Sequence, residues 1–173
     1  MELGNTRLNV PNNNSVGLLI SLLVRYPEVA TINFDPRART LRLTFLTRPG
    51  LSEDQWHQVL KRLQQSVEVY ARLERQRVQR AWFDVDSFGE LVTLVVERDV
   101  ETLSRGEISL LVELLRDLLG EELMVDEVGA TGDDDMYMQE QYIDQLLDDL
   151  RESRQEKCLV AFREEGRVVV FNR

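Results

Sequence analysis

The sequence has few of the residues that most often carry chemistry. It contains one cysteine, Cys158, and one histidine, His57, among 173 residues. A single cysteine excludes an internal disulfide and fits a reducing compartment. The sequence has no clustered cysteine and histidine ligands, no glycine-rich phosphate loop and no G-x-S-x-G motif. We therefore assign no catalytic, cofactor-binding or metal-ligating residue, although an active site built from carboxylates alone would leave no spacing signature.

Long apolar runs are also lacking. The longest, VGLLISLLV at 16–24, is far shorter than the ~20 residues that a membrane-spanning helix needs. The first residues, MELGNTRLNVPNNN, do not show the basic, apolar and cleavage-site succession of a secretory signal. We therefore expect a soluble cytoplasmic protein with no membrane partner.

Charge is abundant but unevenly distributed, and the formal net charge is −10. Residues 1–98 carry 13 basic and 11 acidic side chains, whereas residues 99–157 carry 5 basic and 18 acidic ones. The acidic excess therefore lies almost wholly in one segment. Such asymmetry is typical of an acidic face that binds a partner, and equally of a surface kept soluble by charge repulsion.

Hydrophobic periodicity predicts an α+β protein whose first half is a ferredoxin-like sandwich. The expected elements are strand 5–10, helix 15–26, strands 30–35 and 39–47, helix 52–74 and strand 79–86. Their β-α-β-β-α-β order is that of the ferredoxin-like fold. That fold hosts many unrelated functions, so it does not decide the function by itself.

The second half predicts another α+β layer with hairpin–helix repeats. Ser52 with Gln55 and Ser104 with Glu107 have the spacing of capping boxes, and each helix start follows a predicted hairpin. The later expected elements are a helix to 119, a strand at LMVDE, a helix at 136–153 and a C-terminal β-hairpin at 158–171. We expect a ferredoxin-like part, 1–98, and an acidic part, 99–173, which can pack together as one domain.

Three consecutive aspartates, Asp133–Asp135, raise the question of a metal site. An EF-hand loop that began at Asp133 would need glycine at its sixth position and glutamate at its twelfth, where this chain has Met138 and Asp144. Negative charge just before a helix is stabilised by the helix dipole. We interpret the segment as a solvated joint and helix entry, and we expect no metal requirement.

Two charged sets are candidate binding residues. Three acidic residues spaced four apart predict an acidic interaction face on the helix at 136–153, namely Glu140, Asp144 and Asp148. A candidate anion-binding set is Arg72, Arg75, Arg77 and Arg80, which Arg37, Arg39 and Arg42 could join. The RNA-recognition strand signature is absent from the sequence, and a pI near 4.7 argues against nucleic acid as a partner.

Two segments are apolar on more sides than a monomer normally covers. The helix at 15–26 is apolar almost all round, which is typical of a buried helix or of one whose exposed side a partner chain covers. The C-terminal hairpin is apolar on both faces, which predicts a strand buried within a sheet or covered on both sides. We therefore expect a non-enzymatic binding or regulatory protein that acts through protein–protein contacts, including self-association. The alternatives are a nucleic-acid- or ribosome-associated factor that uses the arginines, and a small enzyme with a carboxylate-only site.

Overall fold

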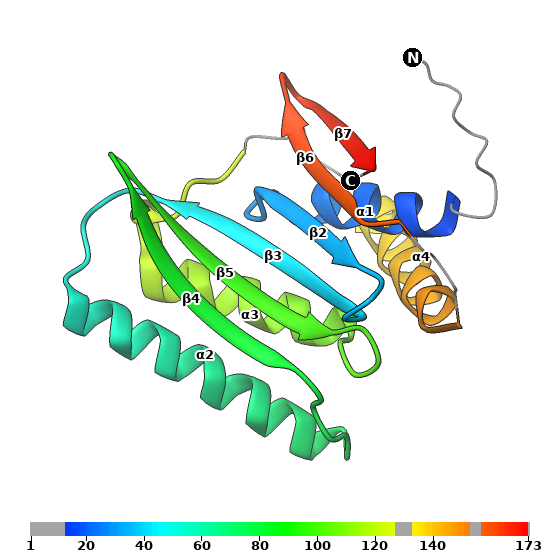
Figure 1. Cartoon of the computed structure of the whole chain (residues 1–173), viewed down its shortest axis with the longest axis horizontal. Helices are drawn as coiled ribbons and strands as arrows, with labels where there is room; N and C mark the ends of the chain where they lie inside the picture. Colours follow the sequence, from blue (N-terminus) through cyan, green and yellow to red (C-terminus); the bar gives the residue numbers. More distant parts are fainter. Residues whose placement is uncertain (1–12, 127–132, 153–156, 173) are drawn as a thin grey trace.

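The fold is built on one six-stranded antiparallel sheet. A computed structural model of the chain describes residues 13–126, 133–152 and 157–172. The strand order is β4-β5-β3-β2-β6-β7 (Figure 1). The strands are β2 (Thr31–Asp35), β3 (Thr40–Thr47), β4 (Ala81–Phe88), β5 (Leu91–Asp99), β6 (Leu159–Glu164) and β7 (Arg167–Asn172). The two halves of the chain share this sheet, because β6 pairs with β2.

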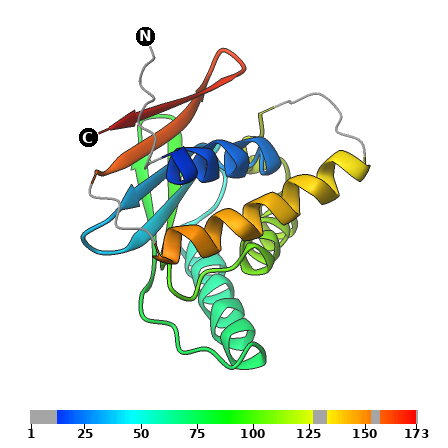
Figure 2. The same cartoon turned by 90° about the vertical axis from the view of Figure 1, so that its right-hand side faces the viewer.

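Four helices lie on one side of the sheet (Figures 1 and 2). They are α1 (Asn13–Arg25), α2 (Glu53–Leu73), α3 (Arg105–Leu119) and α4 (Asp133–Glu152). Helix α1 packs against β2, β6 and β7, whereas α2 packs against β4 and α3, and α4 lies along α1 and contacts α3. None of these described helices combines the length and the apolar character needed to cross a bilayer.

Strand alternation explains why only one side of the sheet is covered. Ile32, Leu43 and Leu94 point toward the helices and are buried in a single core with apolar residues of all four helices. The opposite side of the sheet, which no described element covers, is called the uncovered face. Its side chains are Asn33, Arg42, Trp82, Glu97, Val160, Phe162, Val169, Phe171 and their neighbours at alternate positions.

The α+β class is confirmed, but the ferredoxin-like topology and the hairpin–helix repeats are not. Strand β5 lies between β3 and β4, where a ferredoxin-like sandwich would need its first strand, and residues 5–10 lie outside the described part of the chain. The two hairpin–helix units also pack differently. Helix α2 follows the β2–β3 hairpin but packs beneath β4 of the next hairpin.

Two local predictions were wrong. The described part of the stretch LMVDE, residues 123–126, is not a strand, because it pairs with the sheet only through the isolated bridge of Leu123 with Thr47. Helix α1 spans Asn13–Arg25, so it begins two residues before the predicted start at 15. The aspartates interpreted as a joint and helix entry, Asp133–Asp135, are the first residues of α4, and residues 127–132 before them lie outside the described part of the chain.

The predicted capping box of α2 is confirmed, whereas that of α3 is only half formed. Ser52 Oγ accepts a hydrogen bond from the Gln55 amide at 3.2 Å, and Gln55 Oε1 accepts one from the Ser52 amide at 2.8 Å. Ser104 Oγ accepts from the Glu107 amide at 3.2 Å. The Glu107 carboxylate does not return to Ser104, because it pairs with an arginine in the core.

The arginine that pairs with Glu107 in the core is Arg98, which lies near the end of β5. Arg98 and Glu107 are each 1% exposed, and two hydrogen bonds of 2.6 and 2.8 Å join their side chains. Arg98 also donates to Asp99, to Thr102 at 3.1 Å and to the Arg80 carbonyl at 3.0 Å. A buried charge is tolerated only when it is paired and hydrogen-bonded, and this network meets both conditions.

The capping interactions predict measurable stability losses. We expect Ser52→Ala and Ser104→Ala each to lower the free energy of unfolding by about 1 kcal/mol, because each leaves a helix amide without its acceptor. Urea denaturation followed by circular dichroism measures the loss. A neutral result at either serine would contradict the role of that cap.

The buried pair predicts a larger and non-additive effect. We expect Arg98→Met to cost about 3–5 kcal/mol, because the buried carboxylates of Glu107 and Asp99 would both lose their counter-ion. The double variant Arg98→Met with Glu107→Leu should lose less stability than Arg98→Met alone, since it removes one of those two carboxylates. Urea denaturation of the three proteins makes the comparison, and a double variant less stable than the single one would refute the explanation.

Candidate functional site

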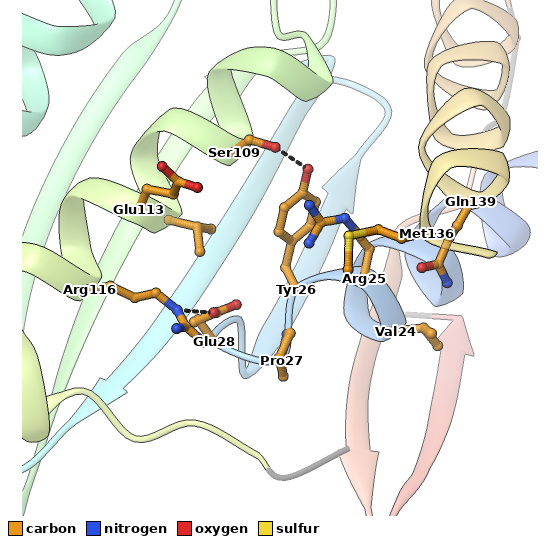
Figure 3. A pocket seen from close by; sticks show the side chains of 11 residues that line it. Val24, Arg25, Tyr26, Pro27, Glu28, Ser109, Glu113, Arg116, Met136 and Gln139 are labelled. Atoms are coloured by element: carbon orange, nitrogen blue, oxygen red, sulfur yellow. Dashed lines mark hydrogen bonds and ion pairs between the residues drawn. The ribbon is translucent and has the colours of Figure 1, made fainter. Parts of the chain in front are cut away.

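A pocket of about 310 Å³ lies where the end of α1 meets α3 and the first half of α4 (Figure 3). Tyr26 and Glu28 come from the segment that follows α1, Ser109 and Arg116 from α3, and Gln139 from α4. Pro27 ends α1, because it has no amide to donate. The pocket is therefore formed at a helix end by three elements distant in sequence.

Tyr26 is the most buried polar group in the pocket. Its hydroxyl and Ser109 Oγ are 2.6 Å apart and share a hydrogen bond (Figure 3). Burial raises the pKa of the Tyr26 phenol above its ordinary value, despite the opposing effect of the Ser109 hydrogen bond. The phenol is therefore protonated at neutral pH, and it cannot act as the base that a nucleophilic Ser109 would need.

The charged groups around the pocket are largely paired with each other. Arg25 contacts Glu140 at 2.6 Å, and Arg116 donates to Glu28 (Figure 3). Glu113 also lines the pocket. The arrangement can hold a small polar molecule through hydroxyl and carboxylate groups. It places no activated nucleophile among the described side chains.

The cysteine and the histidine are not brought together. His57 lies exposed on α2, which packs against β4 at one edge of the sheet, whereas Cys158 precedes β6 on the other half. Within the described residues, no group of three or more histidine, cysteine, aspartate or glutamate side chains could hold a metal ion. The side chains of Asp133–Asp135 are not among those described.

The predicted acidic face is paired with arginines of the same chain. Arg25 and Arg105 approach Glu140 at 2.6 and 3.5 Å. Arg105 also contacts Asp144 at 3.1 Å. The third carboxylate, Asp148, contacts Arg151 one helical turn away. These pairs reduce the charge that α4 presents, and they join α4 to α1 and α3.

The candidate anion-binding set is divided between two places. Arg80 reaches the uncovered face, where Arg80 and Arg42 stand over the Trp82 ring at 5.9 and 5.5 Å. Both also contact Glu97 at 2.7 Å. The remaining members of the set, Arg72, Arg75 and Arg77, are exposed at the end of α2 and in the next loop, with no ion-pair partner among the described residues.

The sequence interpretation missed the cluster of Trp82, Arg42, Arg80 and Glu97. Burial acts to raise the pKa of Glu97, but hydrogen bonds and charge from the two arginines outweigh it, so the pKa is lowered. Glu97 therefore stays ionised at neutral pH and holds both guanidinium groups in place. Strand alternation marks Arg42, Trp82 and Glu97 as outward positions, but their meeting depends on the strand order.

Arg163 fixes the C-terminal hairpin to α1. It extends from β6 and donates to the carbonyl oxygens of Val29 at 2.6 Å, of Tyr26 at 2.9 Å and of Leu23. Burial lowers the pKa of Arg163, partly offset by Asp126 at 3.5 Å. The guanidinium thus occupies the carbonyl end of α1, where a positive charge is favourable.

The described residues cover the hairpin on one side, whereas the sequence predicts that both of its faces are buried. Strand β7 is an edge strand, and Val168 and Val170 pack toward the core. On the uncovered face, the rings of Phe162 and Phe171 lie 5.5 Å apart, and Phe171 is 51% exposed. The hairpin therefore presents an aromatic pair and an open strand edge on the described surface.

The charge distribution predicts no appreciable binding to generic RNA or DNA at physiological salt. The protein has a net charge of −10, and Glu97 already neutralises part of the Arg42 and Arg80 charge. Fluorescence anisotropy with single-stranded and duplex oligonucleotides across a salt series provides the measurement. Micromolar binding that weakens with salt and is lost in Arg75→Glu with Arg77→Glu, but not in the exposed control Lys61→Glu with Arg62→Glu, would overturn the expectation.

Comparison with known proteins gives no relative from which a function could be transferred. The chain significantly matches no protein-family model, no curated protein and no solved structure. Function is therefore inferred below from the surfaces of the chain itself.

Proposed function

We propose that this is a non-enzymatic binding or regulatory protein that acts through protein–protein contacts, with the β6–β7 hairpin as its binding surface. The observation that carries the proposal is the aromatic pair on the uncovered face. Phe162 and Phe171 lie next to Val160 and Val169, so the hairpin is apolar on the side without helices. Complete burial of one such side chain by a partner would contribute about 1.5–3 kcal/mol to the free energy of binding.

The hairpin has the structure expected of a protein-binding surface. Its anchor to α1 through Arg163 holds it in a defined position before a partner arrives, which lowers the entropic cost of binding. Aromatic side chains are enriched among the residues that dominate binding energy. An open strand edge next to them adds backbone donors and acceptors that a partner strand can pair.

The pocket and the arginines give weaker support to the other functions. In the pocket, Tyr26 is a protonated hydrogen-bond partner of Ser109, which favours binding over catalysis. On the uncovered face, Arg42 and Arg80 are held by Glu97, which leaves less positive charge for phosphate groups. Neither feature favours an enzyme or a nucleic-acid-binding protein over a protein-binding one.

Site-specific photo-crosslinking tests the proposal. We expect p-benzoylphenylalanine at position 171 to form a covalent adduct with a protein in the cells that produce this chain, because Phe171 belongs to the binding surface. The matched control is position 69, since Val69 is exposed on α2 at the other side of the sheet. Mass spectrometry identifies the adduct. Absence of any adduct at 171, or the same adducts at 69, would refute the binding surface.

A further inference from the structure

We infer that the partner of the C-terminal hairpin is a second copy of the same chain, joined across a two-fold axis by antiparallel pairing of β7 with β7. This inference rests on the proposed function and names its partner. The contact surface consists of the outer edge of β7, the exposed side chains Ile20 and Val24 of α1, and Tyr142 of α4. We call these residues the lateral surface.

The outer edge of β7 lacks the features by which edge strands normally avoid pairing. The sequence of 168–171 is VVVF, with no charge and no proline. Its register with β6 is continuous from Glu164–Arg167 to Leu159–Asn172, so no bulge twists the edge away. The opposite edge differs, because β4 carries Asp84 and Asp86 and packs against α2. Among the described strands, β7 therefore has the edge that is open to another strand.

The turn geometry shows which backbone groups face outward. The β6–β7 turn has two residues, Glu165 and Gly166, both with positive φ (51° and 78°), as in the common tight hairpin turn. The residues that flank such a turn exchange both backbone hydrogen bonds, and the pattern then alternates along the strand. Arg167, Val169 and Phe171 therefore bond to β6. The backbone groups that point outward belong to Val168, Val170 and Asn172.

These three outward residues are complementary to themselves. An antiparallel register that centres Val170 on Val170 of the other copy places Val168 opposite Asn172, and it pairs every outward amide and carbonyl of the three. A two-fold axis requires that one surface match its own copy, and an antiparallel strand edge meets that requirement. A single protein thus supplies both sides of the contact.

Helix α1 extends the lateral surface below β7. Figure 2 faces this side of the molecule and shows the β6–β7 hairpin, α1 and α4 side by side. Ile20 and Val24 are 37% and 42% exposed, and they share the helix face of Gly17. A Cβ atom at Gly17 would lie 3.6 Å from the Tyr142 hydroxyl, so Tyr142, 54% exposed, borders the same stripe. Pairing of β7 would bring this apolar stripe against its copy.

Charge favours a second copy over a foreign partner. Apart from Arg167 at the start of β7, no residue of the lateral surface is charged, whereas the protein has a net charge of −10. Two copies repel through most of their surface, and they repel least where neither presents charge. The neighbouring α4 carboxylate Glu140 is paired with Arg25, which lowers the charge beside the stripe further. A basic foreign partner would be drawn to the free acidic residues elsewhere instead.

Light scattering coupled to size exclusion tests the inference on the full chain. We expect a mass of twice 20.1 kDa at high concentration, with dissociation on dilution. An affinity on the order of 10 μM would make the dimer the main species at about 100 μM protein. Ile20→Glu with Val24→Glu should give a monomer that keeps its melting temperature, because both side chains are exposed. The matched control Val69→Glu should remain dimeric.

The strand edge is tested separately. Val170→Pro removes one outward amide but no bond to β6, so it should weaken the dimer. In a Cys158→Ser background, Val170→Cys should form a disulfide between copies under mild oxidation, since directly opposed Cα atoms lie about 5.5 Å apart. Val69→Cys should not form this disulfide. A dimer that these variants leave unchanged would place the interface elsewhere and overturn the inference.

The two proposals fail in different ways. A protein that stays monomeric at about 100 μM overturns self-association. If position 171 still forms an adduct with a different protein in cells, the proposed function stands with another partner. A monomer without any adduct at 171 refutes both.

Discussion

The buried pair of Arg98 and Glu107 fixes where the helical layer begins relative to the sheet. Arg98 lies near the end of β5 and Glu107 in the first turn of α3, so the pair joins the two layers across one short loop. Arg151, in the last turn of α4, donates to the carbonyl oxygens of Val100 and Leu103 in the same loop at 3.0 and 2.5 Å. Helices α3 and α4 are therefore both positioned from this loop. The pocket and the α1–α4 contact depend on that placement.

Features that depend on neighbours in the chain could be predicted from the sequence, and features that depend on strand order could not. The box of Ser52 with Gln55 and the hairpins follow from residues a few positions apart. The Arg98–Glu107 pair has no local sequence signal. The spacing of Glu107 from Ser104 fits a capping box equally well, and Glu107 turns to Arg98 because both are buried where α3 packs next to β5. The cluster on Trp82 likewise requires β5 to lie between β3 and β4, which alternation within one strand does not indicate.

The acidic composition of the second half does not make α4 a free acidic face. Its carboxylates Glu140 and Asp144 are matched by Arg25 and Arg105, one from each half of the chain. Partly exposed pairs of this kind contribute little to stability, so their effect lies in the charge that they cancel. They lower the repulsion on the side of α4 next to α1. A strongly acidic protein can in this way keep one side suited to association.

Helix α1 and the β6–β7 hairpin are both more apolar than their burial in one chain requires. They are far apart in the sequence, and the fold places them side by side. Helix α1 buries one side against the sheet and leaves Ile20 and Val24 exposed, while β7 packs beside it and leaves its edge open. Arg163 holds them in this arrangement by joining β6 to the end of α1. Separate exposed apolar residues are common on any protein and need no explanation. Their alignment along one side with little charge, next to the open edge of β7, is what favours a single partner that covers both.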